Sequence, residues 1–169
     1  GAGGYTVGVL VQANHGRRHQ LRVGGAPVGE ELSDGARTRK ETGSIIILVA
    51  TDAPLLPHQL KRLARRAALG LARTGSVAGN GSGDLFLAFS TANPEAGAAE
   101  GLPSLHMLPN DRMDPLFEAV VGATEEAIVN AMVAARTMTG HEGRTVEALP
   151  HEAMLAVLRR HGLLTTVRP

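Results

Sequence analysis

The sequence has 169 residues, of which 43% are hydrophobic and 20% charged, and its formal net charge is +1. This balance is typical of a globular chain that forms one domain or a large part of one. The low net charge and an aromatic content of 2% argue against a nucleic-acid partner, which requires cationic surfaces and stacking platforms. Because the chain contains no Cys, disulfides, thiolate nucleophiles and Cys-based zinc sites are excluded.

Neither a membrane span nor a targeting segment is visible. No apolar run approaches the roughly 18 residues that a spanning helix needs, and the start lacks the basic and apolar parts of a signal peptide. We therefore expect a soluble, cytoplasmic protein with no membrane partner. The chain lacks an initiator Met and opens almost directly into a strand, so we expect it to begin inside a larger protein. The seven His residues lack ligand spacing such as HExxH, and we expect no metal and no organic cofactor.

The first predicted elements are strands. Residues 5–12 are rich in β-branched side chains and predict a strand, followed by a polar turn at 13–16 that contains Asn14. Asn and Gly favour such turns because both tolerate left-handed backbone angles. Two further short strands are expected at 19–23 and 28–32. Residues 33–42 are polar and without apolar periodicity, which predicts an exposed linker.

The linker leads to Gly43, Ser44 and an aliphatic run that ends at Thr51. Such a run, bounded by turn residues, predicts a strand buried on both faces. If the Gly43–Ser44 bond were cut, Ser44 would carry a hydroxyl and a free α-amine, whose reference pKa is about 7.7–8.0. One residue would then supply nucleophile and base, as in N-terminal nucleophile hydrolases. Because Gly-Ser before a strand is also common in ordinary turns, the pair alone leaves both readings open.

Helices alternate with one more strand in the rest of the chain. The expected elements are a helix over 58–74, a loop over 75–84, a strand over 85–91, an irregular excursion over 93–112 and helices over 113–138 and 150–160. Gly75 is expected to cap the first helix, and Gly140 and Gly143 are expected to stop the second. Strands with packed helices indicate an α/β chain of stacked sheets covered by helices.

Polar residues in two loops are candidates for chemistry. Ser82 and Asp84 follow a Gly-rich loop that lacks the Lys-Ser/Thr ending of a P-loop, so phosphate binding is a poor interpretation. A carboxylate at this strand start can orient a terminal amine, and Asn14 can donate to a developing oxyanion. A tight connecting loop and an ordinary turn Asn are the competing interpretations.

Four segments occur together in a recognisable order: Val9–Asn14, Thr42–Ile47, Thr51–Leu60 and Gly79–Asp84. Taken together they resemble the L-aminopeptidase/D-Ala-esterase/amidase family, which includes the β-peptidyl aminopeptidases. The resemblance covers essentially the whole chain, and four motifs in sequence are far more specific than any one of them.

The resemblance implies a four-layer αββα sandwich, like that of N-terminal nucleophile hydrolases and related to the ornithine acetyltransferase fold. It implies an inactive precursor that cleaves itself at the Gly43–Ser44 bond. Residues 1–43 would be the end of the α chain and residues 44–169 the β chain, both within a single domain. The front of the α chain would lie outside this sequence, with a Tyr that assists the oxyanion hole and an acidic residue that binds the substrate's amino group.

The resemblance also implies roles for individual residues. Ser44 would be the nucleophile and its α-amine the base, and Asn14 would be the oxyanion-hole donor. Ser82 and Asp84 match the polar pair near the nucleophile, although some relatives have Glu in place of Asp84. Implied partners are short peptides, amino-acid amides and esters as substrates, the remainder of the α chain, and further copies in a tetramer of αβ units.

Two alternatives stay open. One is an acyltransferase like ornithine acetyltransferase, although such enzymes use Thr where this chain has Ser44. The other is a non-catalytic fragment that needs an upstream chain for activity. The preference for L- or D-residues and for α- or β-amino acids is not predicted by the sequence.

Overall fold

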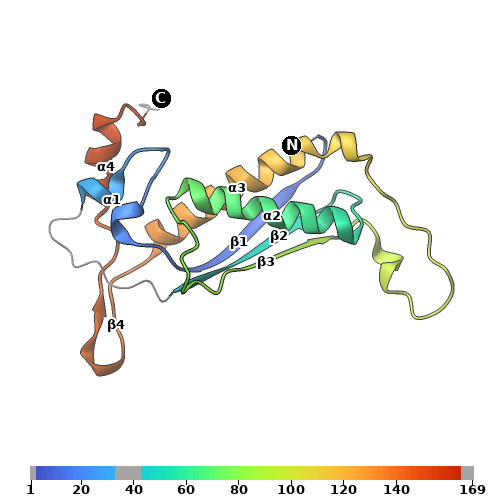
Figure 1. Ribbon diagram of the computed structural model, residues 1–169, viewed down its shortest axis with the longest axis horizontal. Helices are drawn as coiled ribbons and strands as arrows, with labels where there is room; N and C mark the ends of the chain where they lie inside the picture. The colour runs from blue at the N-terminus through green and yellow to red at the C-terminus, as the bar shows by residue number, and fades with distance from the viewer. Residues whose placement is uncertain (1–2, 33–42, 165–169) are drawn as a thin grey trace.

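The computed structural model of the chain describes residues 3–32 and 43–164. A three-stranded sheet is formed by β1 (Val7–Asn14), β2 (Ser44–Thr51) and β3 (Leu85–Ser90), in that order. Two long helices, α2 (Pro57–Arg73) and α3 (Asp114–Ala134), lie along one side of it (Figure 1). The strands predicted at 5–12, after Ser44 and at 85–91 and the presence of two long helices are therefore confirmed, and the expected linker at 33–42 lies outside the described residues.

The strand register brings distant parts of the chain to one end of the sheet. β1 and β2 pair antiparallel, from Val7 opposite Thr51 to Asn14 opposite Ser44. β2 and β3 pair parallel, beginning with Ile46 opposite Leu85. Because α2 forms the crossover between the two parallel strands, the loop before β3 returns to the end of the sheet where β2 begins.

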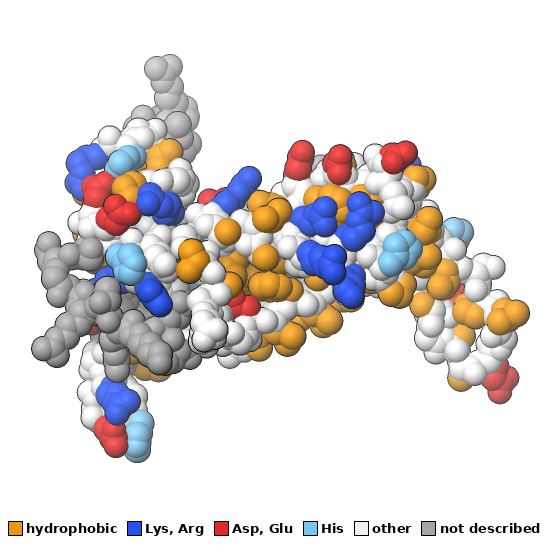
Figure 2. Space-filling view, in the orientation of Figure 1, with side chains coloured by type: hydrophobic (Ala, Val, Ile, Leu, Met, Phe, Trp, Pro, Cys, Tyr) orange, Lys and Arg blue, Asp and Glu red, His pale blue; other side chains and the backbone are white. Residues whose placement is uncertain are grey.

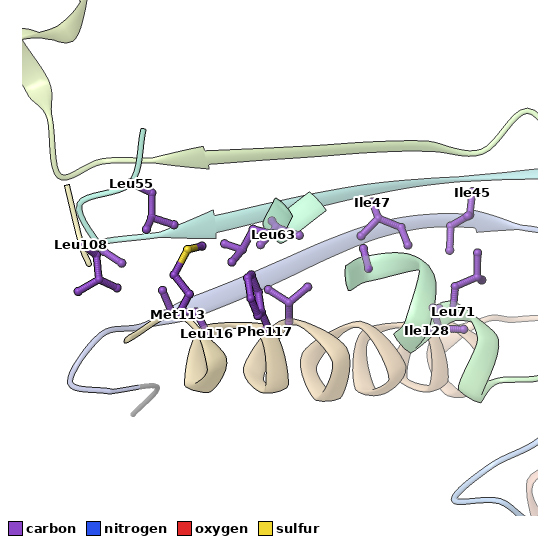
Figure 3. Close-up of a cluster of buried hydrophobic side chains, with 14 residues drawn as sticks. Ile45, Ile47, Leu55, Leu63, Leu71, Leu108, Met113, Leu116, Phe117 and Ile128 are labelled. Atoms are coloured by element: carbon purple, nitrogen blue, oxygen red, sulfur yellow. The ribbon is translucent and has the colours of Figure 1, made fainter. Parts of the chain in front are cut away.

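The main core lies between the sheet and the two helices (Figure 3). β2 contributes the side chains of Ile45, Ile47 and Val49, each 0% exposed. The helices contribute an apolar stripe at helical spacing, namely Leu63, Ala67 and Leu71 on α2 and Leu116, Phe117, Val120 and Ile128 on α3. The apolar patterns read from the sequence therefore face one another.

The opposite face of the sheet is apolar as well, and no helix of the described chain covers it (Figure 1). Ile46 is 39% exposed and Leu10 on β1 is 66% exposed. On β3, Leu85, Leu87 and Phe89 are also exposed. The prediction that the β2 strand is buried on both faces is therefore correct for one face only. We call the uncovered side the open face.

Two residues of α2, Gln59 and Gly70, fix its position against its neighbours. Gln59 is fully buried, its side-chain oxygen accepts the Leu56 N–H at 3.2 Å, and its amide donates to the Leu108 carbonyl at 2.8 Å. Gly70 lies where α2 crosses α3, and a Cβ there would be 2.6 Å from Cβ of Thr124. Glycine at this position lets the two helices approach closely.

The outer surface of α2 carries a group of cationic side chains, which Figure 2 shows as a blue cluster: Lys61, Arg62, Arg65 and Arg66. The guanidinium carbons of Arg62 and Arg66 lie 5.2 and 3.9 Å from the centre of the Phe117 ring on α3. These distances are those of cation–π contacts, so part of the group packs against α3.

A second, smaller cluster lies at the end of the molecule where α1 (Val28–Glu31) meets α4 (His151–Arg160) (Figure 1). Its buried members are Ala26, Val28, Met154, Val157 and Leu158. The short strands expected at 19–23 and 28–32 are wrong. The first region contains a 3₁₀ turn over Arg18–Gln20 and the second is α1. The Leu32 N–H donates to the Val28 carbonyl at 3.0 Å, a helical bond that a four-residue segment without a partner strand makes locally.

The second long helix, α3, ends earlier than predicted. α3 stops at Ala134, and the chain then forms a hairpin of β4 (Met138–Thr139) and β5 (Thr145–Val146). Gly140 and Gly143 therefore lie in the hairpin turn and do not end the helix. β-branched Thr139 and Thr145 pair across the hairpin, which favours strand over helix. Among the described residues, no helix is both long and apolar enough to span a bilayer.

Candidate active site

Ser44 is the first residue of β2 and the cross-strand neighbour of Asn14, the last residue of β1. Side chains alternate between the faces of a strand, so Ser44 shares a face with Ile46, which is on the open face. Paired residues of neighbouring strands point to the same face, which places Asn14 there too. The nucleophile candidate and the oxyanion candidate therefore lie side by side at one end of the open face.

The Ser44 hydroxyl is held by the loop before β3. The backbone N–H of Gly83 donates to Ser44 Oγ at 2.9 Å. A Cβ on Gly83 would lie 3.1 Å from the same oxygen, which is tighter than an ordinary contact. Glycine at position 83 therefore leaves the Oγ room to accept this hydrogen bond. The sequence reading of this loop considered Ser82 and Asp84 and missed the contribution of the residue between them.

Asp84 is fixed beside the backbone of Ser44. Its Oδ1 accepts the N–H of Ile45 at 3.1 Å and the hydroxyl hydrogen of Ser82. Its Oδ2 is buried and has no hydrogen-bond partner among residues 3–32 and 43–164. A buried carboxylate oxygen without a donor is costly, so Oδ2 could accept a further hydrogen bond that none of the described residues supplies. The N–H that Asp84 accepts is that of Ile45, the residue directly after Ser44.

Gly43 lies against the end of β1. A Cβ at position 43 would be 1.8 Å from the backbone oxygen of Asn14, a distance that no side chain tolerates. The absence of a side chain at Gly43 thus allows the chain to enter β2 in register with Asn14. All five candidate residues, Asn14, Gly43, Ser44, Ser82 and Asp84, gather at the same end of the sheet.

Asn14 also borders a cavity of about 550 Å³. Apolar side chains of Leu21, Leu32, Met132 and Leu149 line part of its wall, and Ser44 is not among its lining residues. Within the described residues, this cavity therefore lies beside the oxyanion candidate and does not reach the nucleophile candidate.

Comparison with known proteins identifies relatives over nearly the whole chain. The pattern of peptidase family S58 matches residues 1–146. The chain is 50% identical over 180 aligned residues to β-peptidyl aminopeptidase BapA of Sphingosinicella microcystinivorans, covering 97% of this chain and 46% of that protein.

Solved structures show the same relationship. One is the L-aminopeptidase D-Ala-esterase/amidase of Ochrobactrum anthropi, which is described as a prototype for the serine aminopeptidases and as a new variant of the Ntn hydrolase fold. It superposes with a TM-score of 0.85 at 47% identity, and the match covers 95% of this chain and 45% of that chain. A Burkholderia sp. β-aminopeptidase superposes with a TM-score of 0.82 at 48% identity, over 99% and 47%.

This chain spans less than half the length of these relatives. The prediction of an α/β fold of the N-terminal-nucleophile-hydrolase type is confirmed, and this chain supplies one helical layer and one sheet of it. Because the pattern of peptidase family S58 matches residues 1–146, most of the sequence, the chain belongs to that family.

Proposed function

We propose that this chain carries the catalytic end of a self-processing serine aminopeptidase, amidase and esterase. The observation that carries the proposal is the hydrogen bond from the Gly83 N–H to Ser44 Oγ at 2.9 Å, next to a carboxylate with an unsatisfied oxygen. The names of the relatives, which are aminopeptidases, support the same reaction class. Because the chain spans less than half the length of these relatives, we propose that further polypeptide completes the substrate site.

Self-cleavage is the first proposed step. Ser44 Oγ attacks the carbonyl carbon of Gly43, the Gly43–Ser44 C–N bond breaks, and the Ser44 nitrogen leaves as an amine that takes up the hydroxyl proton. Water then hydrolyses the resulting ester. The products are a Gly43 carboxylate on one chain and, on the other, a Ser44 with a free α-amine and a free hydroxyl.

Substrate hydrolysis reuses the same atoms. The α-amine of Ser44 accepts the hydroxyl proton while Oγ attacks the carbonyl of the substrate's first residue. The Asn14 amide donates to the oxyanion, a type of contact worth about 2.7–4 kcal/mol when removed. The ammonium returns its proton to the leaving amine or alkoxide, and water releases the acyl group.

Asp84 and Ser82 are proposed to hold the new amine. After the cut, the Ser44 ammonium is a donor adjacent to the Ile45 amide, which Asp84 Oδ1 already accepts at 3.1 Å. The unpartnered Oδ2 is then satisfied by the donor that cleavage creates. Ser82 fixes the carboxylate through its hydroxyl. This would orient the amine toward Oγ, the third-group role in nucleophile–base systems.

The proposed substrates are short peptides, amino-acid amides and esters. We also propose that the open face packs against a second sheet supplied by the remainder of the protein, which would complete the four-layer sandwich. Assembly into a tetramer of αβ units and a cytoplasmic location stay predictions. Ser at position 44 disfavours the acyltransferase alternative, whose members use Thr.

The test uses the full-length protein with Ser44→Ala and, as a matched control, Ser104→Ala in an exposed loop. Ser44→Ala is expected to leave the chain uncut and to reduce hydrolysis of an amino-acid p-nitroanilide below detection, while Ser104→Ala behaves like the parent. Intact mass and initial rates measure the two effects. A Ser44→Ala protein that still splits at the Gly43–Ser44 bond would overturn the mechanism.

A further inference from the structure

The α1–α4 cluster joins residues from the two sides of the proposed cut. Its members Ala26 and Val28 precede Gly43, and Met154, Val157 and Leu158 follow Ser44. We propose that α4 is an interchain clamp, which keeps the end of the upstream chain docked on the downstream chain after the Gly43–Ser44 bond is broken. The inference rests on the proposed self-cleavage, because without a cut the same contact is intramolecular.

The apolar part of the clamp is well buried. Val28 on α1 is 0% exposed and Val157 on α4 is 1% exposed. Leu21, Val23, Leu32 and Leu149 pack around them. The cluster shares no member with the main core between the sheet and the long helices.

The polar part of the clamp is centred on Glu31, the last residue of α1. Its carboxylate pairs with Arg160 through Oε2 and with His161 Nε2 through Oε1 at 2.5 Å. Both partners lie at the end of α4. The hydrogen bond from Arg160 lowers the pKa of Glu31 most, and the hydrogen bond from His161 lowers it further. The lowered pKa keeps the Glu31 carboxylate charged beside these two side chains. The clamp thus joins an apolar contact to a charge contact across the proposed cut.

The need for a clamp follows from where the strands end. Pairing of β1 with β2 fixes the upstream chain only as far as Asn14. Beyond it, the Arg22 N–H donates to the Thr74 carbonyl at 3.0 Å, and α1 rests on α4. Both contacts are made to residues downstream of the proposed cut, as is the close approach of Gly75 to the Gln20 carbonyl. After cleavage they would help to hold the segment that follows the oxyanion candidate. Loss of the clamp is therefore expected to loosen residues 21–32 without separating the sheet.

The experiment makes the cut independently of self-cleavage. Full-length protein with Ser44→Ala is given a site-specific protease recognition sequence in place of residues 35–40, and is nicked there. Hydrogen exchange is followed at amides with defined acceptors: Arg22, Gly29 (to the Leu21 carbonyl at 2.9 Å) and Leu32. Arg159→Ala, whose side chain is exposed and next to Arg160, serves as the matched control.

In the nicked protein, Val157→Ala is expected to speed exchange in residues 21–32 at least tenfold, and Arg160→Ala about three- to fivefold. Arg159→Ala should change it less than twofold. Peptides from α2 must keep parental exchange, which shows that the variants remain folded. Unchanged exchange in Val157→Ala, or an equal effect of Arg159→Ala, overturns the clamp. The mass of the protein with Ser44 intact reports self-cleavage separately, so failure of the two proposals is distinguishable.

Discussion

The two faces of the sheet have similar apolar compositions and opposite surroundings. On β2, Ile45 and Ile47 are 0% exposed beneath α2 and α3, whereas Ile46 between them is 39% exposed. Ser44 and Asn14 lie at one end of the exposed side by strand register. The comparison indicates a division of tasks. The covered face holds this part of the protein together, and the open face carries the candidate site at one end and an apolar surface that no described helix covers.

The largest expected effect is on the free energy of unfolding of the full-length protein. It shows whether both faces of the sheet are covered there. Ile47→Ala on the covered face should lower the free energy of unfolding by about 2–5 kcal/mol, through lost burial and a cavity. Phe89→Asp on the open face should cost at least as much, because an unpaired carboxylate would be buried. Urea unfolding measures both.

Leu69→Asp is the control, because Leu69 is 56% exposed on the outer side of α2, and the change should stay within about 0.5 kcal/mol. A Phe89→Asp protein as stable as Leu69→Asp would show that the open face is solvent-exposed in the complete molecule. The proposed second sheet would then be wrong.

A second prediction separates chemistry from folding on the open face. Asn14→Ala should lower kcat by about 10²–10³, since an oxyanion donor is lost, and should leave thermal unfolding close to the parent. Gln12→Ala is matched, because Gln12 lies two residues earlier on the same exposed side of β1, and it should retain kcat. Equal losses in the two variants would remove Asn14 from the reaction.

The smallest effect belongs to the α1–α4 cluster, which lies on neither face of the sheet. The pKa of Glu31 is lowered from its ordinary value of 4.5, first by Arg160 and then by His161. A depressed carboxyl pKa contributes stability that is present above the unfolded-state value and is lost as pH falls through the folded-state value. Acidification below about pH 4.5 should therefore weaken the cluster in the parent, and Glu31→Gln should remove this dependence. Exchange in residues 21–32 as a function of pH measures it, and identical profiles would contradict the assignment.

Periodicity and length predicted the parts of the fold that have strong patterns. The aliphatic run after Ser44 and the stripes of α2 and α3 are long enough that tertiary packing does not override them. The predictions for the short segments at 19–23 and 28–32 are wrong because their backbone amides form local hydrogen bonds, Leu21 N–H to the Arg18 carbonyl and Leu32 N–H to the Val28 carbonyl. Packing of Val28 with the side chains of α4 outweighs the strand preference of a β-branched residue. The end of α3 was placed too late because apolar residues continue to Met138 while the backbone turns at Ala135.

The candidate site likewise has parts that the sequence predicts and parts that only the folded chain reveals. Motifs in order along the chain predict Ser44, Asn14, Ser82 and Asp84 as site residues. The structure brings them to one end of the sheet, and their roles stay predictions. The role of the Gly83 N–H was missed, because a backbone donor has no side-chain signature and its target depends on how β3 aligns with β2. The unsatisfied Asp84 Oδ2 is likewise a property of the folded chain, since it depends on which amides reach the carboxylate.

The most direct measurement is the intact mass of the full-length protein under denaturing conditions, with sequencing of any new N-terminus. The account predicts two chains, the second beginning at Ser44, and an uncut chain for Ser44→Ala. A parent protein that remains a single chain while hydrolysing aminopeptidase substrates would contradict the central claim, because Ser44 would then lack the free amine that we propose as its base.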